Sequence, residues 1–283
     1  MRIAKIRFLP TLMGVAFLVV AASLRADAGA WGQPEGKLYD KLSANYYVAT
    51  QYYDDTGKRR SFPYDGRFTD LNLSNYIEYG ITDSLTLVAT IALKRIETSD
   101  KFATTSTSGV GDVELGVKGT LGERAYGVLS HQITIKAPGF YDKTSRLPLG
   151  NGQLDIEYRL LLGASLWRFF PGYANLEAGY RYRAEAPSDE FRYLAEIGGE
   201  MTGASYARAK LDGVVSMRNE DPVTDQGGNP TTVNRFSVVK LDLAVGYRLG
   251  GTWGVEAGYT AALNGENTAD GVTWSLGITY QIR

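Results

Sequence analysis

Ionisable side chains recur at every second position in several stretches of this sequence. In Gly152–Gly163, which reads GQLDIEYRLLLG, the residues Asp155, Glu157 and Arg159 alternate with apolar ones. Carboxylates and guanidinium groups at this spacing can form ion pairs or line a charged channel. A period of two is typical of a β-strand with one polar and one apolar face.

The same alternation places acids and bases on the polar face of the other predicted strands, in nearly equal numbers. The acids are Asp70, Glu78, Asp112, Glu114, Asp155, Glu157, Glu177, Glu196, Glu200, Asp212, Asp242 and Glu256. The bases are Lys94, Lys118, Lys136, Arg159, Arg181, Arg183, Arg192, Arg208, Lys210, Lys240 and Arg248. An anion pore needs an excess of Arg and Lys, and a cation pore needs rings of Asp and Glu. The nearly equal numbers of acids and bases therefore predict cross-strand ion pairs. These charges either only keep the barrel interior hydrated and neutralise one another, or they form opposed acidic and basic walls across a narrow channel.

The single histidine, His131, limits the catalytic chemistry that the chain can perform. A Ser-His hydrolase would have to use it, and the alternation puts it on the apolar face with Leu129 and Ile133. A nucleophile must come within hydrogen-bond range of its base, yet the apolar faces of the neighbouring predicted strands carry no serine. We therefore expect no enzymatic activity, and a surface lipid hydrolase using His131 is the weakest alternative.

Metal and cofactor sites are not expected either. The chain has no cysteine, and its carboxylates are spread over many strands instead of clustering as in a calcium loop. The glycines of GVGDVELG, residues 109–116, do not open a helix after a strand, so they do not predict a phosphate-binding loop. The 30 basic and 31 acidic residues give a net charge of −1, which argues against a nucleic-acid partner.

The first residues predict export. A basic head and an apolar run are followed by the small-residue pattern Ala-Asp-Ala at residues 26–28, which is typical of a secretory signal peptide. We expect a signal peptide over residues 1–28, with cleavage after residue 28 or 30, and one domain over residues 29–283. After Ala30 no run approaches the ~18 apolar residues of a membrane helix.

Twelve segments after this leader alternate with a period of two, and none of them shows helical periodicity. Many are close to the about 9–11 residues that a tilted strand needs to cross a bilayer. The predicted strands are residues 43–53, 67–79, 85–96, 110–121, 126–137, 153–164, 174–183, 190–200, 206–217, 236–248, 253–261 and 272–283.

Long and short connections alternate between these strands. The longer ones are residues 54–66, 98–109, 138–152 and 218–234, with 184–189 and 263–271 as shorter examples. The tight turns are residues 80–84, 122–124, 167–172, 203–205 and 249–252. Short periplasmic turns and long outer loops are typical of outer-membrane barrels. We therefore predict an all-β fold, a transmembrane antiparallel up-and-down β-barrel of about 12 strands with both termini periplasmic. Loops 54–66, 138–152 and 218–234 would project over the mouth as gates or form solvated surface.

In such a barrel the apolar face of each strand contacts lipid, and the charged face lines the lumen. The apolar residues of the first segment, Leu154, Ile156, Tyr158 and Leu160, should then face lipid. The acids and bases named above are the candidate lumen-lining residues. Aromatic residues lie toward strand ends on the apolar face, where they would form interfacial girdles. They are Tyr52, Tyr79, Tyr182, Phe191, Tyr193, Phe236, Tyr247, Trp253, Trp274 and Tyr280.

Several segments resemble a family of proteobacterial outer-membrane barrels. They are AWGQPEGKLY, YYDDTGKRRSFPYDGRF, LSNYIEYGITDSLTLVATI, GVGDVELGVKG and APGFYDKTSRLPLGNGQLDIEYRLLLG. The similarity is strongest from Trp31 to Gly163. The family is described as transporters linked to the meta-cleavage pathway of phenol degradation. The resemblance implies a barrel and the uptake of small aromatic or apolar compounds, and it assigns no binding residues.

Together these features predict a channel or transporter for small solutes in the cell outer membrane. Twelve strands lie between small barrels that side chains fill and the about 16–18-stranded porins that leave an aqueous channel. We therefore expect passive passage through a narrow charged lumen. The alternative is an occluded barrel with a structural or accessory role in the envelope or in exopolysaccharide export. The expected partners are outer-membrane lipid and lipopolysaccharide, the barrel assembly machinery and a small-molecule solute.

Overall fold

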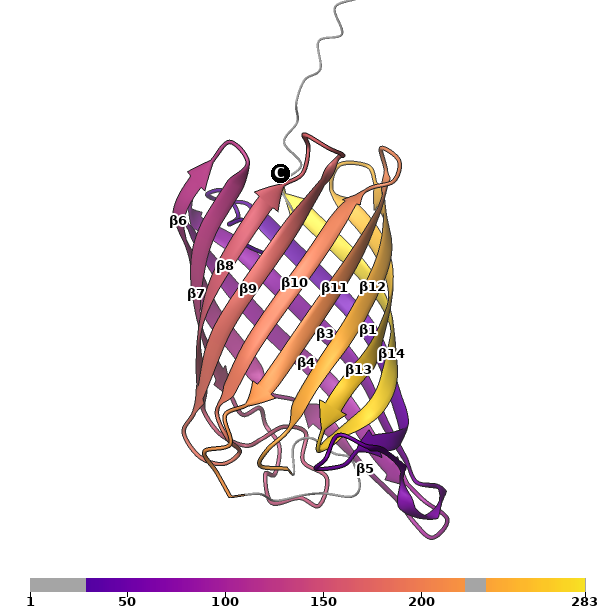
Figure 1. Cartoon of the computed structure of the whole chain (residues 1–283). Coiled ribbons are helices and arrows are strands. Elements are labelled where there is room, and N and C mark those ends of the chain that lie inside the picture. The colour runs from indigo at the N-terminus through magenta and orange to yellow at the C-terminus, as the bar shows by residue number, and fades with distance from the viewer. Residues whose placement is uncertain (1–28, 222–232, 283) are drawn as a thin grey trace, which may run out of the picture.

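The computed structural model describes residues 29–221 and 233–282 and shows a closed antiparallel β-barrel (Figure 1). Twelve strands form the wall, and each pairs with the next until β14 pairs with β1 and closes the barrel. They are β1 (Leu38–Tyr53), β3 (Arg67–Thr82), β4 (Leu85–Ser99), β6 (Val113–Arg124), β7 (Gly127–Ala137), β8 (Asp155–Ser165), β9 (Gly172–Arg183), β10 (Glu190–Glu200), β11 (Ser205–Ser216), β12 (Ser237–Leu249), β13 (Trp253–Glu266) and β14 (Thr268–Ile282). The predicted all-β barrel of about 12 strands is confirmed.

Two short strands extend this wall. β2 (Arg59–Ser61) pairs with the end of β1 and precedes a 3-10 turn, η1 (Pro63–Asp65), while β5 (Thr104–Val110) pairs with the end of β4. The chain passes from β5 to β6 at Gly111, along the same edge of β4. A Cβ atom on Gly111 would lie 2.8 Å from the Lys94 side chain, so this close approach favours glycine.

Two segments that were predicted as loops consist largely of strands. Residues 98–109 form a hairpin that includes the end of β4 and most of β5, and residues 263–271 lie almost entirely in β13 and β14. Those two strands meet at Asn267, whose φ of 49° is left-handed, a conformation that asparagine adopts more readily than most residues. The loop prediction rested on the polar composition of these residues, and it was wrong because strand ends beyond a membrane can be polar on both faces.

The outer surface of the barrel is apolar. Side chains that the alternation directed toward lipid are strongly exposed, whereas Asp155 and Glu157 between them are buried. The exposed fractions are 45 % for Leu154, 43 % for Ile156, 47 % for Tyr158 and 44 % for Leu160. Soluble monomers rarely expose a contiguous apolar surface of this extent. The predicted polarity, apolar outside and charged inside, is therefore present.

The two ends of the barrel carry different connections. The short turns after β3, β6, β8, β10 and β12 lie at one end, together with the end of β14 (Figure 1). The long connections, such as residues 138–154, lie at the other end. The predicted signal peptide and part of the loop 218–234 lie outside the described residues. Over residues 29–221 and 233–282, the structure has no helix that is long and apolar enough to cross a membrane.

Candidate functional site

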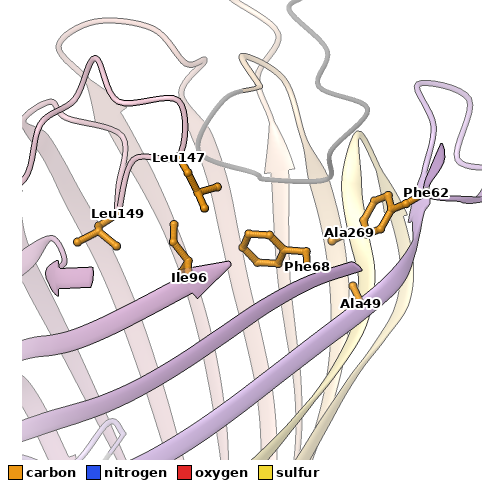
Figure 2. Packing of buried hydrophobic residues seen from close by; sticks show 7 residues of the cluster. All are labelled: Ala49, Phe62, Phe68, Ile96, Leu147, Leu149 and Ala269. Atoms are coloured by element: carbon orange, nitrogen blue, oxygen red, sulfur yellow. The ribbon is translucent and has the colours of Figure 1, made fainter. Parts of the chain in front are cut away.

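An apolar cluster fills part of the barrel mouth at the long-loop end (Figure 2). Residues 138–154 connect β7 to β8 and fold inward, so that Leu147 and Leu149 are buried. They belong to one cluster with Phe68 of β3 and Ile96 of β4, which point into the barrel. The other members of this mouth cluster are Ala49, Phe62 and Ala269. The loop 138–152 was expected to project over the mouth; its second half, residues 147–153, instead packs inside the mouth, whereas Phe140 and Lys143 in its first half are exposed.

Polar contacts fasten this loop to the wall. The Tyr141 hydroxyl donates to Asp112 Oδ1 and accepts the Gly152 backbone N–H at 2.8 Å. Burial and the neighbouring Asp112 carboxylate raise the pKa of Tyr141 above its ordinary value. Lys136 Nζ of β7 donates to Asn151 Oδ1 at 3.2 Å. The loop is therefore fixed at both of its ends.

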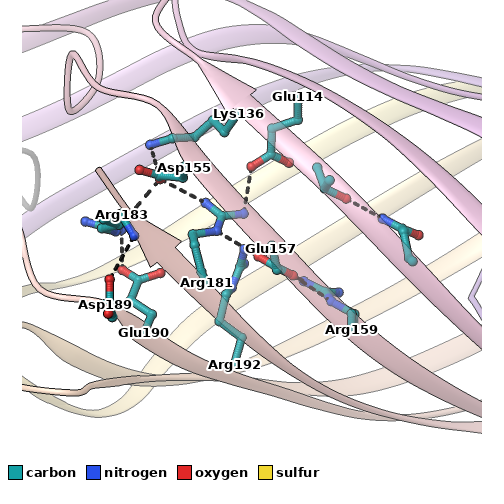
Figure 3. Close-up of polar contacts among 12 residues, drawn as sticks. Glu114, Lys136, Asp155, Glu157, Arg159, Arg181, Arg183, Asp189, Glu190 and Arg192 are labelled. Carbon is teal, nitrogen blue, oxygen red and sulfur yellow. Dashed lines mark hydrogen bonds and ion pairs between the residues drawn. The ribbon is translucent and has the colours of Figure 1, made fainter. Parts of the chain in front are cut away.

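Next to the mouth, a network of ion pairs covers the inner face of β6 to β10 (Figure 3). Glu157 lies within it, and its carboxylate accepts from Arg181 Nε at 2.7 Å and Arg192 Nη1 at 3.0 Å, and also from Arg159. The Glu157 side chain is 4 % exposed. A buried carboxylate is costly without partners, and here three guanidinium groups compensate its charge.

The network continues through Asp155. Lys136 Nζ lies 2.7 Å from Asp155 Oδ2, and Arg181 and Arg183 each place a nitrogen 3.8 Å from it. Arg181 also donates to Glu114 Oε1 at 2.8 Å. Glu190 and Asp189 extend the network at Arg183. Acids and bases alternate within this one wall, so the predicted cross-strand pairs are present and the two signs do not separate into opposed walls here.

At the short-turn end, the chain that precedes β1 enters the lumen. We call residues 29–35 the N-terminal segment. Trp31 is buried in a cluster with Val128 of β7 and Leu161 of β8. Its ring packs edge-on against Tyr173 of β9, with 6.2 Å between ring centroids. The segment therefore covers the inner face of the wall next to the short turns.

Inward side chains also bind the N-terminal segment through hydrogen bonds. Lys118 Nζ donates to the carbonyl oxygen of Gly29 at 2.8 Å and forms an ion pair with Glu78 at 2.7 Å. Gln33 Nε2 donates to the other Glu78 oxygen at 3.0 Å, and the Gln33 backbone N–H donates to Thr86 Oγ1 at 2.9 Å. This segment was not predicted to line the lumen, because it has no period and precedes the first predicted strand.

A cavity of about 470 Å³ lies beside the N-terminal segment, lined mainly by β9 to β14, β1 and β3. Its charged lining residues are Lys41, Arg159, Glu177, Glu196, Glu200, Arg208, Lys210, Asp242, Arg248 and Glu256. Acids and bases are equal in number among them. Arg208 links three of the acids, with nitrogens 3.0 Å from Glu256, 3.0 Å from Asp242 and 3.4 Å from Glu196.

Four tyrosines also line the cavity, and the sequence analysis did not identify them. They are Tyr39, Tyr76, Tyr173 and Tyr206. Tyr173 Oη donates to Glu196 at 2.9 Å, and the Arg248 guanidinium lies 5.4 Å from the centre of the Tyr206 ring. Tyrosine was expected at the membrane interfaces, but each of these four lies an even number of residues from the inward charged residues of its strand. This spacing, as between Tyr206 and Arg208, is the signal that could have identified them as lumen residues.

Among the other predicted lumen residues, Asp70 pairs with Lys94 at 2.9 Å, and Asp112 joins the network through Lys136 at 3.1 Å. Within the cavity lining, Arg248 lies 2.5 Å from Glu200. In the β11–β12 register, Asp212 is opposite Lys240 and Lys210 is opposite Asp242. The structure therefore gathers the predicted residues into a network near the mouth, a cavity near the short turns, and scattered pairs.

His131 faces outward on β7. In the strand register it is opposite Gly119 of β6 and Leu160 of β8, and its ring centroid lies 6.0 Å from that of Tyr158. None of these neighbours is a serine or a carboxylate, so the arrangement provides no hydrolase triad. Among the described residues there is no group of three or more His, Asp or Glu side chains that could hold a metal ion.

Comparisons with known proteins identify the fold. No protein-family model matches the sequence, and the comparison with curated proteins finds no match. Among solved structures, the COG4313 outer membrane channel from Pseudomonas putida F1 is similar, with a TM-score of 0.73 and 15 % identity over 89 % of this chain and 98 % of that chain. The NanC porin has a TM-score of 0.52 and 8 % identity over 86 % of this chain and 100 % of that chain. The translocator domain of the autotransporter NalP from Neisseria meningitidis has a TM-score of 0.51 and 14 % identity over 88 % and 90 %. The chain has the fold of outer-membrane β-barrels.

Proposed function

We propose that the protein is an outer-membrane channel that admits small solutes through its lumen. The observation that carries this proposal is the cavity of about 470 Å³ inside the barrel, next to the N-terminal segment. In this proposal the short turns and both termini are periplasmic, the long loops face outward, and the barrel assembly machinery inserts the chain. The apolar outer surface supports the membrane location.

The route of a solute follows from the positions of the mouth cluster and the N-terminal segment, which each fill part of the lumen. The N-terminal segment is bound to β3, β4 and β6 to β9, through residues such as Glu78, Lys118 and Leu161. The cavity is lined mainly by the opposite side of the barrel, from β9 through β14 to β1. A solute would pass the mouth cluster and the charged network, and then move past the N-terminal segment along this opposite side.

The cavity lining supports small aromatic solutes that carry polar groups. Four tyrosine rings offer aromatic contact, and their hydroxyls and the balanced charges offer hydrogen bonds to hydroxyl or carboxylate substituents. A purely apolar solute would leave buried polar groups such as Arg208 and Glu256 without water. This solute class agrees with the resemblance to the aromatic-uptake family.

A second function is favoured by the packing at both ends of the lumen. The mouth cluster and the cluster around Trp31 fill part of the lumen at the long-loop and short-turn ends. An occluded barrel of this kind would serve as a structural or accessory protein, in the envelope or in exopolysaccharide export, without conducting.

Conductance in planar bilayers separates the two functions. For a channel we expect resolved single-channel currents that phenol or benzoate blocks, together with swelling of liposomes in small polar solutes. Absence of current from protein that is folded, as judged by its electrophoretic shift on heating, would overturn the channel and favour the occluded barrel.

A further inference from the structure

The outward face of β3 and β4 changes from apolar to charged near the long-loop end. Leu73 and Leu93 lie opposite each other on this face and are 42 and 55 % exposed. Arg95 is the next outward residue of β4 toward the long-loop end, and Arg67 begins β3 at that end. Leu71 of β3 lies opposite Arg95 and is 53 % exposed, so the apolar belt ends at Leu71 on β3 and at Leu93 on β4. Arg95 is level with this edge, and Arg67 lies beyond it.

Both guanidinium groups remain largely open to the surroundings. Arg67 Nη2 donates to the hydroxyl of Tyr46 on β1 at 2.8 Å. The Arg95 side chain is 59 % exposed, and its Nη2 lies 3.5 Å from Glu97 Oε2 on the same strand. A guanidinium has five N–H donors, so each of these single contacts leaves donors available for another acceptor.

Hydroxyl groups of β5 adjoin Arg95 and Glu97 of β4. In the β4–β5 register, Ser108 is opposite Arg95, and Ser106 is opposite Glu97. Both serines are exposed. β5 pairs with β4 and with no other strand of the described sheet. The surface formed by Arg67, Arg95, Ser106 and Ser108, which we call the rim site, therefore combines two cations with two hydroxyls.

Other walls of the barrel are apolar at the corresponding end. The outward residues there include Ile156 of β8, Tyr182 of β9, Phe191 of β10 and Val215 of β11, each at least 40 % exposed. These residues continue the belt up to the strand ends. The rim site is therefore a local feature of the β3–β5 side and not a general property of the outer rim.

We propose that the rim site binds phosphate groups on the headgroup of an anionic glycolipid in the outer leaflet. Guanidinium groups bind phosphate oxygens in a bidentate manner, and serine hydroxyls can donate to sugar or phosphate oxygens. Headgroup phosphates lie just beyond the acyl chains, at the depth where the belt ends on Leu71 and Leu93. The inference rests on the membrane orientation in the proposed function. Glu97 opposes the binding of an anion at Arg95.

The test measures retention of lipid A by the folded full barrel in detergent, using native mass spectrometry. The variant is Arg67→Gln with Arg95→Gln. The matched control is Arg60→Gln, because Arg60 is also an exposed arginine of the long-loop end, at 56 % exposure, and pairs with Asp54. We expect the double variant to bind lipid A roughly 30-fold more weakly, from two basic residues at an anionic surface. The control should bind as the wild type does.

Further measurements identify the ligand and distinguish lost binding from a folding defect. Dephosphorylated lipid A should not be retained, and Glu97→Gln should bind lipid A more tightly, which a folding defect cannot produce. Equal lipid A affinity in wild type and double variant would overturn the proposal. Equal binding of phosphatidylglycerol, or of inorganic phosphate alone, would overturn the assignment to a glycolipid. A barrel that retains lipid A but carries no current would refute only the channel.

Discussion

Lys118 and Glu78 form an ion pair of 2.7 Å inside the barrel, and their side chains are 1 and 0 % exposed. The same Lys118 Nζ donates to the carbonyl oxygen of Gly29. One ammonium group therefore joins β3, β6 and the N-terminal segment. A buried ion pair adds little net stability, because desolvation offsets the attraction, but removing one partner is costly.

Substitutions in the Lys118–Glu78 pair should affect the free energy of unfolding and the single-channel conductance differently. Lys118→Met leaves Glu78 buried without its cation, so we expect the free energy of unfolding to fall by about 3–5 kcal/mol. Lys118→Met combined with Glu78→Leu should regain most of that loss and still release Gly29. Urea unfolding in detergent and single-channel conductance measure the two effects. Wild-type conductance in the double variant would contradict the anchoring role.

Trp31→Ala should widen the passage beside the N-terminal segment. The substitution removes the ring that packs on Val128, Leu161 and Tyr173. We expect larger single-channel currents with an unchanged barrel, since the wall strands keep their own pairing. Tyr126→Ala is the control, because Tyr126 is an exposed aromatic in a short turn, at 66 % exposure. Equal currents in both variants would show that Trp31 does not restrict the lumen.

In the proposed channel, Arg208→Gln should shift the selectivity toward cations. Arg208 lies within 3.4 Å of Glu196, Asp242 and Glu256, so its loss leaves three carboxylates with less compensation. Acidic rings favour cations in channels. We expect the reversal potential in a salt gradient to shift toward that of the cation. Lys143→Gln, which removes an exposed charge outside the strands, should leave the potential unchanged.

Thiol labelling can locate the loop 138–154, because the natural chain has no cysteine. A cysteine at Leu149→Cys should react slowly with a polyethylene-glycol maleimide, since Leu149 is 2 % exposed in the mouth cluster. A cysteine at Phe140→Cys should react quickly, since Phe140 is 94 % exposed. Equally fast labelling of both positions would mean that the loop projects away from the mouth.

A charged residue on the lipid-facing surface should destabilise the barrel more, the deeper it lies in the membrane. Leu160→Arg places a cation in the middle of β8, so we expect the free energy of unfolding in lipid to fall by about 2–4 kcal/mol. Leu154→Arg lies beyond the end of β8 and should cost about 0–1 kcal/mol. Equal costs at the two positions would contradict a membrane boundary between them.

The alternation of residue types was sufficient to predict the barrel. It determines which side chains share a face, so the sequence alone places Leu160 and Glu157 on opposite surfaces. The same rule failed at residues 98–109 and 263–271, because strand ends outside a membrane need no apolar face. Tyr76 and Tyr206 were missed for a related reason: tyrosine suits both a membrane interface and a polar lumen.

The contents of the lumen could not be predicted from the pattern. The N-terminal segment and the loop 138–154 have no period, and their positions depend on tertiary contacts such as Trp31 with Tyr173 and Leu147 with Ile96. The charged residues were predicted to pair, and they do. The sequence could not show which of them meet, because that depends on register and on strand curvature.

The β1–β14 seam has a consequence for how the molecule is made. These two strands are the farthest apart in the chain, yet they pair from Leu38 with Ile282 to Tyr53 with Thr268. Until they meet, both carry bare backbone donors and acceptors that hydrocarbon cannot satisfy. The two sheet edges must therefore be sheltered from hydrocarbon until this seam closes.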